Sequence, residues 1–253
     1  MNVIRSMVIA MAMYSKIPVP NVKWEEASMR YIFCFFPLVG VIIAGLEIGW
    51  WYLCQVTALG DMLYATVAAV IPFLITGGIH MDGYMDTMDA KHSYQPKEKR
   101  LEILKDPHLG AFAVITALVY VLLYVGFVSE VNTIRGCLLY SISFVISRAC
   151  SSFTFVLFPS AKKEGLFYTF QIAAKKKAIA ITQGIVLTIC LLIGCAIHLW
   201  CGLAILLGTL LTFFYYKRMS EKMFGGVTGD LAGYFLQLIE LIILMLVVVL
   251  VRG

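Results

Sequence analysis

The chain has 253 residues, of which 61% are hydrophobic and only 14% are charged. A soluble domain averages about 45–50% apolar and about 25% charged residues, so this composition excludes a water-soluble globular fold. The formal net charge of +5 follows from the placement of basic residues around membrane spans, so we expect a lipid bilayer and no nucleic acid as a partner.

A membrane helix needs about 20 apolar residues to cross a hydrocarbon core of about 30 Å. Seven stretches reach or approach that length, and the period-two alternation of a β-barrel is absent from the sequence. We therefore predict an all-α, polytopic integral membrane bundle of about seven transmembrane helices, with residues 1–253 forming a single membrane-embedded domain. The predicted spans are residues 31–54, 62–79, 109–129, 136–158, 178–197, 200–216 and 231–251.

Residues 1–30 come before the first span. Their apolar stretch is too short for a signal peptide, so we predict an uncleaved N-terminal interfacial or re-entrant segment that ends at Pro18 and Pro20. Glu47 lies near the far end of the first span, beside Trp50 and Trp51. Since tryptophans favour the membrane–water interface, we expect Glu47 there as well.

Lysine and arginine are concentrated in four segments that alternate with the opposite connections: 1–30, 80–108, 159–177 and 217–229. The opposite side has only Arg135 and Arg252. Because cytoplasmic loops carry the excess of basic residues, we predict a cytoplasmic N-terminus and a functional site that faces the cytoplasm. The longest of the basic connections, 80–108, is our candidate catalytic loop.

The segment that begins at His80 contains Asp82, Asp86 and Asp89, spaced i, i+4 and i+7. A helix would place the three carboxylates on one face, where like charges repel. This is costly unless a cation lies between them, and Mg²⁺ typically binds one or two carboxylates together with substrate phosphates. We therefore predict a Mg²⁺ site. The alternative is a solvated polar helix start just beyond the second span.

The residues around this segment suggest contacts with a substrate. His80 is a candidate general base or substrate contact, and a hydrogen-bonded structural histidine is an equally good explanation. Gly77 and Gly78 permit a close backbone approach or a helix break. Arg100 and Lys105 are candidate partners of anionic phosphates, although ordinary topological charge is the alternative.

Two ionisable residues, Arg148 and Glu240, lie near the middle of predicted spans. Buried charges need partners, so we expect Arg148 to face the interior and to contact Glu240, another carboxylate or a substrate phosphate. The last span follows a glycine-rich turn in which Thr228 and Asp230 could approach a phosphate or ligate a metal. Asp106 is a further candidate metal ligand, or a helix N-cap.

Together these segments resemble the cobalamin synthase family, adenosylcobinamide-GDP ribazoletransferase, over essentially the whole chain. The most specific motif runs from Gly77 to Gly83 and continues with Asp86, Thr87 and Asp89. The other matching segments are Lys105-Asp106-Pro107 with Gly110, Ser147-Arg148, Gly226–Asp230, Ile17–Pro20 and Phe36–Gly40. Met81, Met85 and Ala232 depart mildly from the usual pattern, and none of them is a proposed ligand.

The resemblance implies that adenosylcobinamide-GDP reacts with α-ribazole or its 5′-phosphate and releases GMP, which completes the nucleotide loop of cobalamin. It implies Mg²⁺ as the cofactor and the bacterial cytoplasmic membrane as the location. It leaves open a homo-oligomer and association with other enzymes of nucleotide-loop assembly. The predicted catalytic residues are Asp82, Asp86 and His80. The predicted substrate-binding residues are Gly77, Gly78, Arg100, Lys105, Arg148 and Thr228. The predicted metal ligands are Asp82, Asp86, Asp89, Asp106 and Asp230.

Two other classes of protein share some of these features. A transporter also has intramembrane charges, but it usually shows inverted repeats and helices broken at the midplane, and the sequence shows no repeat. A phosphotransferase of the CDP-alcohol type would share the Mg²⁺ chemistry. Its motif begins with the pair found here at Asp82-Gly83, but the Ala-Arg and the spaced aspartates that follow are missing.

Overall fold

The computed structural model describes residues 2–251, which form helices joined by short connections, with one isolated parallel bridge between Ser160 and Val227. In chain order the helices are α1 (Asn2–Tyr14), α2 (Glu26–Met29), α3 (Ile32–Thr57), α4 (Asp61–Thr76), α5 (Ile79–His92), α6 (Lys97–Ile103), α7 (Ala111–Val128), α8 (Ile134–Leu157), α9 (Gly165–Ala173), α10 (Lys176–Ile197), α11 (Leu199–Phe224) and α12 (Gly229–Leu250).

The predicted all-α polytopic bundle is confirmed. Within the described residues, α3, α7, α8, α10, α11 and α12 are each long and apolar enough to cross a membrane. The pair α4 and α5 passes the same test together and is bent by 95° at the break between the two helices, which gives six or seven spans. The predicted span 200–216 was too short, because α11 continues as a helix to Phe224.

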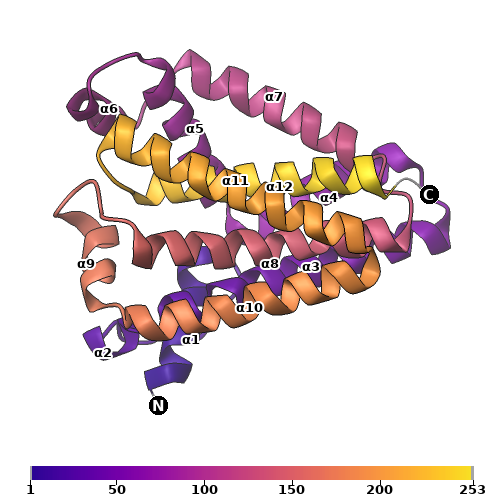
Figure 1. Ribbon diagram of the computed structural model, residues 1–253, viewed down its shortest axis with the longest axis horizontal. Coiled ribbons are helices and arrows are strands. Elements are labelled where there is room, and N and C mark those ends of the chain that lie inside the picture. The colour runs from indigo at the N-terminus through magenta and orange to yellow at the C-terminus, as the bar shows by residue number, and fades with distance from the viewer. Residues whose placement is uncertain (1, 252–253) are drawn as a thin grey trace.

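The bundle is built around α8, which packs against α3, α10 and α12. Most of α8 is buried, whereas α7, α10 and α11 leave much of their apolar surface exposed. A water-soluble protein rarely exposes apolar patches of this size, so this surface is the one that contacts lipid. Figure 1 shows the long helices lying side by side along the longest axis of the molecule.

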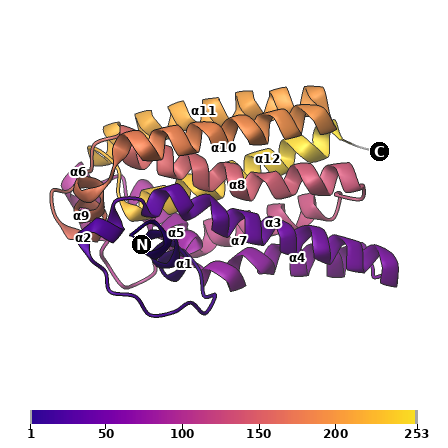
Figure 2. The same ribbon diagram turned by 90° about the horizontal axis from the view of Figure 1, so that it is seen from below.

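The four segments rich in lysine and arginine meet at one end of the bundle, which we call the basic end. The short helices α1, α2, α6 and α9 lie there with α5 and the turn between α11 and α12 (Figures 1 and 2). The last residues of α12 lie at the opposite end, as an odd number of spans requires. The candidate catalytic loop 80–108 is largely helical, since it contains α5 and α6.

Two glycines produce the break between α4 and α5. Gly77 and Gly78 have φ of +64° and +77°, in the left-handed region that glycine adopts without steric cost. The N–H of Gly77 bonds to the carbonyl oxygen of Phe73 and so ends α4. The expected helix break is therefore confirmed, and it turns α5 across the basic end, outside the membrane-spanning segments.

The two intramembrane charges pair with each other. Nη1 of Arg148 lies 2.7 Å from Oε1 of Glu240, and the two side chains are only 1% and 2% exposed. Arg148 also donates to the carbonyl oxygen of Phe144, and Ser147 donates to Glu240 at 2.8 Å. The pair joins α8 to α12 in the interior, as predicted.

The position of Glu47 differs from the one expected from the sequence. Its side chain is fully buried in the bundle, not at the membrane–water interface. Gly40, Ile43 and Glu47 follow one another at helical spacing, so all three lie on the face of α3 that packs against α8. The neighbouring tryptophans misled the prediction, because Trp50 and Trp51 themselves pack against the buried core and do not mark an exposed interface.

We predict that Arg148→Leu strongly destabilises the protein, because it leaves the Glu240 carboxylate buried without its counter-charge. Removing one partner of a buried pair costs about 3–5 kcal/mol, whereas replacing both with apolar residues costs far less. The melting temperature in detergent should therefore fall in Arg148→Leu and recover in Arg148→Leu/Glu240→Leu. Arg135→Leu, at an exposed position, is the matched control. A single variant as stable as the wild type would contradict this account.

Candidate active site

Three cavities lie side by side at the basic end. The α4–α5 cavity, about 690 Å³, is lined by Lys16, Gly77, Gly78 and Met85 among others. The aromatic cavity, about 240 Å³, contains six aromatic rings: Tyr14, Phe33, Phe36, Phe155, Phe167 and Phe170. The basic cavity, about 300 Å³, is defined by Lys105, Lys162 and Thr228. Asp82 lines the first two cavities and Asp230 lines the last two, so the two carboxylates link all three.

A close crossing of α5 and α12 brings these carboxylates together. A Cβ atom added to Gly83 would lie 2.7 Å from the carbonyl oxygen of Asp230, and one added to Gly233 would lie 2.9 Å from that of His80. Both distances are shorter than real Cβ contacts, so only glycine fits at these two positions. The missing side chains let the buried face of α5 lie against the start of α12, which brings the neighbouring Asp82 and Asp86 near Asp230.

Asp86 shows the electrostatic cost of this arrangement. Burial, followed by the negative charges of Asp82, Asp230 and Asp89, raises the pKa of the Asp86 carboxyl from 3.8 to about 7. The predicted repulsion among the aspartates is therefore present, and it includes Asp230 from the far end of the chain.

The carboxylates of Asp82 and Asp86 suit a hard divalent cation whose remaining ligands come from a substrate and from water. Within residues 2–251, no three His, Cys, Asp or Glu side chains lie together as a ready-made metal site. Mg²⁺ needs no such site, because it is usually held by one or two carboxylates plus substrate phosphates and water. Asp82 is exposed and Asp86 is half-buried, so their carboxylates remain open to such an ion.

Asp89 has a different set of partners. Its carboxylate accepts hydrogen bonds from the backbone N–H groups of Gly110, at 2.6 Å, and Ala113, at 2.8 Å. These are unsatisfied donors at the start of α7, and a carboxylate there also interacts favourably with the helix dipole. Asp89 thus ties the end of α5 to α7, and its two carboxylate oxygens are both occupied by these bonds.

Three other predicted residues lie outside the cavities. Asp106 is exposed and pairs with the His108 ring at 2.7 Å. Arg100 reaches the carbonyl oxygen of Met223 at 3.5 Å and so connects α6 to the end of α11. Arg148 is held by Glu240 in the interior and is not among the cavity-lining residues, so the structure gives it no contact with a substrate phosphate.

His80 lies between the aromatic cavity and the interior. It is 5% exposed, and its Nε2 atom has no hydrogen-bond partner among the described residues. Burial, and then the positive charge of Arg148, lower the pKa of His80, so its imidazole is neutral. The ring stacks on Tyr14 with a centroid distance of 6.2 Å.

The basic cavity adds a lysine that the sequence did not single out. Lys162 is half-buried, and its pKa is lowered by burial and by the nearby charge of Lys105. Lys105 itself pairs with Glu164 at 3.5 Å. Thr228 caps α12 by accepting a hydrogen bond from the N–H of Leu231, so the cavity also faces a helix N-terminus. Lysines and a helix N-terminus together favour a phosphate.

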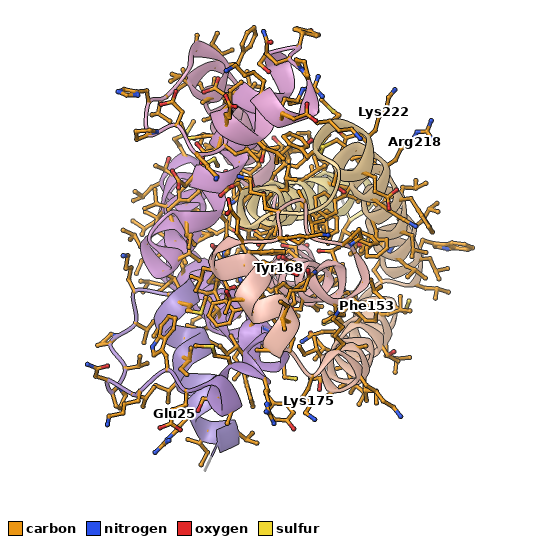
Figure 3. The ribbon with its side chains drawn as sticks, turned by 90° about the vertical axis from the view of Figure 1, so that its left-hand side faces the viewer. Glu25, Phe153, Tyr168, Lys175, Arg218 and Lys222 are labelled. Carbon is orange, nitrogen blue, oxygen red and sulfur yellow. The ribbon has the colours of Figure 1, made fainter. Side chains whose placement is uncertain are left out.

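The helix α9 lies across the basic end in front of the other helix ends, with Tyr168 near the centre of Figure 3. Arg218 and Lys222 are at the rim in the same view and point outward. Gln171 fixes α9 to the end of α8 by donating to the carbonyl oxygens of Phe155 and Phe158, at 2.7 and 2.8 Å. Through Phe167 and Phe170, α9 forms part of the wall of the aromatic cavity.

Fold and site together define a multi-pass membrane enzyme with a polar site at one end of its helical bundle. The family model described as cobalamin-5-phosphate synthase matches residues 6–248 of the chain. The chain belongs to this family, which confirms the resemblance found in its motifs.

Several similar proteins carry the name adenosylcobinamide-GDP ribazoletransferase. One from Lachnoclostridium phytofermentans is 50% identical, with 95% of this chain and 92% of that protein covered. One from Clostridium botulinum is 30% identical, with 95% and 96% covered. One from Geobacillus is 33% identical, with 87% and 86% covered. No solved structure matches the chain.

The raised pKa of Asp86 predicts how stability depends on pH when no divalent cation is present. An unfolded Asp ionises near its ordinary pKa of 3.8, whereas the folded protein holds this proton up to about pH 7. The contribution of Asp86 to stability is therefore present below about pH 4 and is lost as the pH rises to about 7. In EDTA, Asp86→Asn should raise the melting temperature relative to wild type at about pH 8 and much less at about pH 5. An equal difference at both pH values would contradict this assignment.

Proposed function

We propose that this protein joins adenosylcobinamide-GDP to α-ribazole, or to its 5′-phosphate, and forms adenosylcobalamin or its 5′-phosphate with release of GMP. The names of relatives that cover nearly the full length of the chain support this substrate pair. The observation that carries it is the meeting of Asp82, Asp86 and Asp230 beside Lys105 and Lys162 at the end of a membrane bundle.

The reaction is a phosphoryl transfer that forms a phosphodiester. The ribose 3′-hydroxyl attacks the phosphorus next to the cobinamide aminopropanol, a new P–O bond forms, and the P–O bond to GMP breaks. Such reactions are catalysed mainly by positioning the reactants and by neutralising charge on the phosphoryl oxygens. We propose that the Asp230 carboxylate accepts the proton of the attacking hydroxyl, because Asp230 lines both the aromatic and the basic cavities.

We propose that Asp82 and Asp86 hold a Mg²⁺ ion. When bound, the ion neutralises negative charge on the phosphoryl oxygens. The surrounding residues bind and orient the rest of the anionic substrate: Lys162 and Lys105 offer ammonium groups, and the start of α12 offers backbone N–H groups. The backbone at Gly77 and Gly78 lines the α4–α5 cavity on the other side of Asp82, where a larger part of the substrate fits.

We propose that the basic end faces the cytoplasm of a bacterium and that the bundle lies in its cytoplasmic membrane. The gathering of all four lysine- and arginine-rich segments at this end supports that orientation. The site would then receive its soluble nucleotide substrates directly from the cytoplasm. The alternative that the protein is a transporter receives no support from the structure. Transporters usually have helices broken at the midplane of the membrane, whereas the break between α4 and α5 lies beside the site at the basic end (Figure 1).

The experiment that tests this function is an assay of GMP release by the purified protein in detergent or nanodiscs, supplied with adenosylcobinamide-GDP, α-ribazole 5′-phosphate and Mg²⁺. We expect release to require both substrates, to stop in excess EDTA, and to return when Mg²⁺ or Mn²⁺ is added back. Turnover that is unchanged in EDTA would remove the metal from the proposal. No GMP release from well-folded protein with both substrates present would reject the function itself.

A further inference from the structure

The aromatic cavity is a pocket of defined shape and unusual chemistry. Its rings come from α1, α3, α8 and α9, and they pack on one another: Phe33 stacks on Phe155 at 3.7 Å between centroids, and Tyr14 lies 4.2 Å from Phe36. At about 240 Å³ it is smaller than the roughly 300–1,000 Å³ that holds a drug-sized ligand. It therefore suits one flat ring system and not a whole corrinoid.

Five polar side chains line this cavity, and Tyr14 is one of them. Ser151 and His80 belong to its wall, and Asp82 and Asp230 lie where it meets the neighbouring cavities. The Nε2 atom of His80 is buried without a partner among the described residues. Most buried polar atoms in proteins have a hydrogen-bond partner, and leaving one unsatisfied is energetically costly. A ligand with one matching polar atom would remove that cost.

We propose that the aromatic cavity binds the base of the nucleoside substrate, so that the methylated benzimidazole ring of α-ribazole stacks among the aromatic rings and its free ring nitrogen accepts a hydrogen bond from His80 Nε2–H. This inference rests on the proposed function, which supplies the identity of the nucleoside. His80 is then a substrate contact, and its tautomer is the one that carries the proton on Nε2.

The competing occupant is the guanine base of adenosylcobinamide-GDP, and the lining of the cavity disfavours it. Guanine carries several donors and acceptors around its edge, and each one left unpaired in a largely apolar pocket weakens binding. The benzimidazole base offers one free acceptor, and its methyl groups gain from burial against Phe167 and Phe170. With Asp82 and Asp230 facing the ribose, the wall offers the base only the polar side chains of Tyr14, His80 and Ser151, which matches the benzimidazole better than guanine.

The position of the cavity also fits the reaction. A base held among the rings places the attached ribose toward Asp82 and Asp230, where the 3′-hydroxyl must react. Beyond Asp230, the basic cavity with Lys105 and Lys162 is open to the 5′-phosphate. The nucleoside would then span two adjacent cavities, and the guanylylated substrate would approach from the α4–α5 cavity.

The test is a variant that fills the cavity without removing its rings. Ser151→Leu projects an apolar side chain into the pocket, and Leu166→Trp does so from an exposed position on α9. We expect each variant to raise the KM for α-ribazole 5′-phosphate at least tenfold and to leave the KM for adenosylcobinamide-GDP within twofold. Thr188→Leu, which enters the separate apolar cavity between α8, α10 and α11, is the matched control and should change neither.

A binding measurement makes the test independent of catalysis. Free 5,6-dimethylbenzimidazole, titrated calorimetrically, should bind the wild type and Thr188→Leu and should lose at least tenfold in affinity for Ser151→Leu and Leu166→Trp. The proposal is overturned if folded variants keep their KM for α-ribazole 5′-phosphate, or if the increase falls on adenosylcobinamide-GDP instead. Failure of the proposed function is a separate outcome, because the wild type itself would then release no GMP from the two substrates.

Discussion

The site depends on the close crossing of α5 and α12, at which Gly83 faces the backbone of Asp230 and Gly233 faces that of His80. Any side chain at either glycine would push the helices apart and would separate carboxylates that lie nearly 150 residues apart in the chain. The crossing has an electrostatic cost, which is visible in the raised pKa of Asp86. The proposed cation would offset that cost if it lay between the carboxylates, so the packing and the proposed chemistry would be parts of the same arrangement.

Contacts elsewhere in the bundle hold α5 and α12 in place. The Arg148–Glu240 pair fixes α12 to the central helix α8, in an interior where each charge needs the other. At the other end of α5, the Asp89 carboxylate binds the start of α7. The left-handed residues Gly77 and Gly78 direct α5 out of the membrane and across the basic end. None of these contacts involves the proposed reacting groups, but together they position the carboxylates of α5 and α12.

Much of this could be predicted from the sequence, because the signals are local. Apolar runs predicted the spans, and the spacing of Asp82 and Asp86 predicted an acidic helix face. The pairing of Arg148 with Glu240 followed from the cost of unpaired buried charge. A carboxylate that caps a helix, such as Asp89, could not be told from one that faces a substrate, because both occupy the same face of α5.

The residues that were missed belong to cavities assembled from distant segments. Lys162 resembled an ordinary topological lysine, and its place beside Asp230 follows from the packing of the α8–α9 connection against the start of α12. Tyr14 and Ser151 looked like unremarkable positions in apolar stretches. Their role depends on α1 and α8 meeting at the basic end. No local pattern contains that information.

The central claim is that Asp82 and Asp230 act in one site, and its most direct test is the kcat of GMP release by charge-neutral variants. Asp82→Asn and Asp230→Asn should each fold normally, as judged by melting temperature, and lose at least about a hundredfold in kcat, or about 2.7 kcal/mol of barrier stabilisation. Asp61→Asn, at the start of α4 far from the basic end, should retain wild-type activity. Near-normal GMP release by well-folded Asp82→Asn would show that the site lies elsewhere.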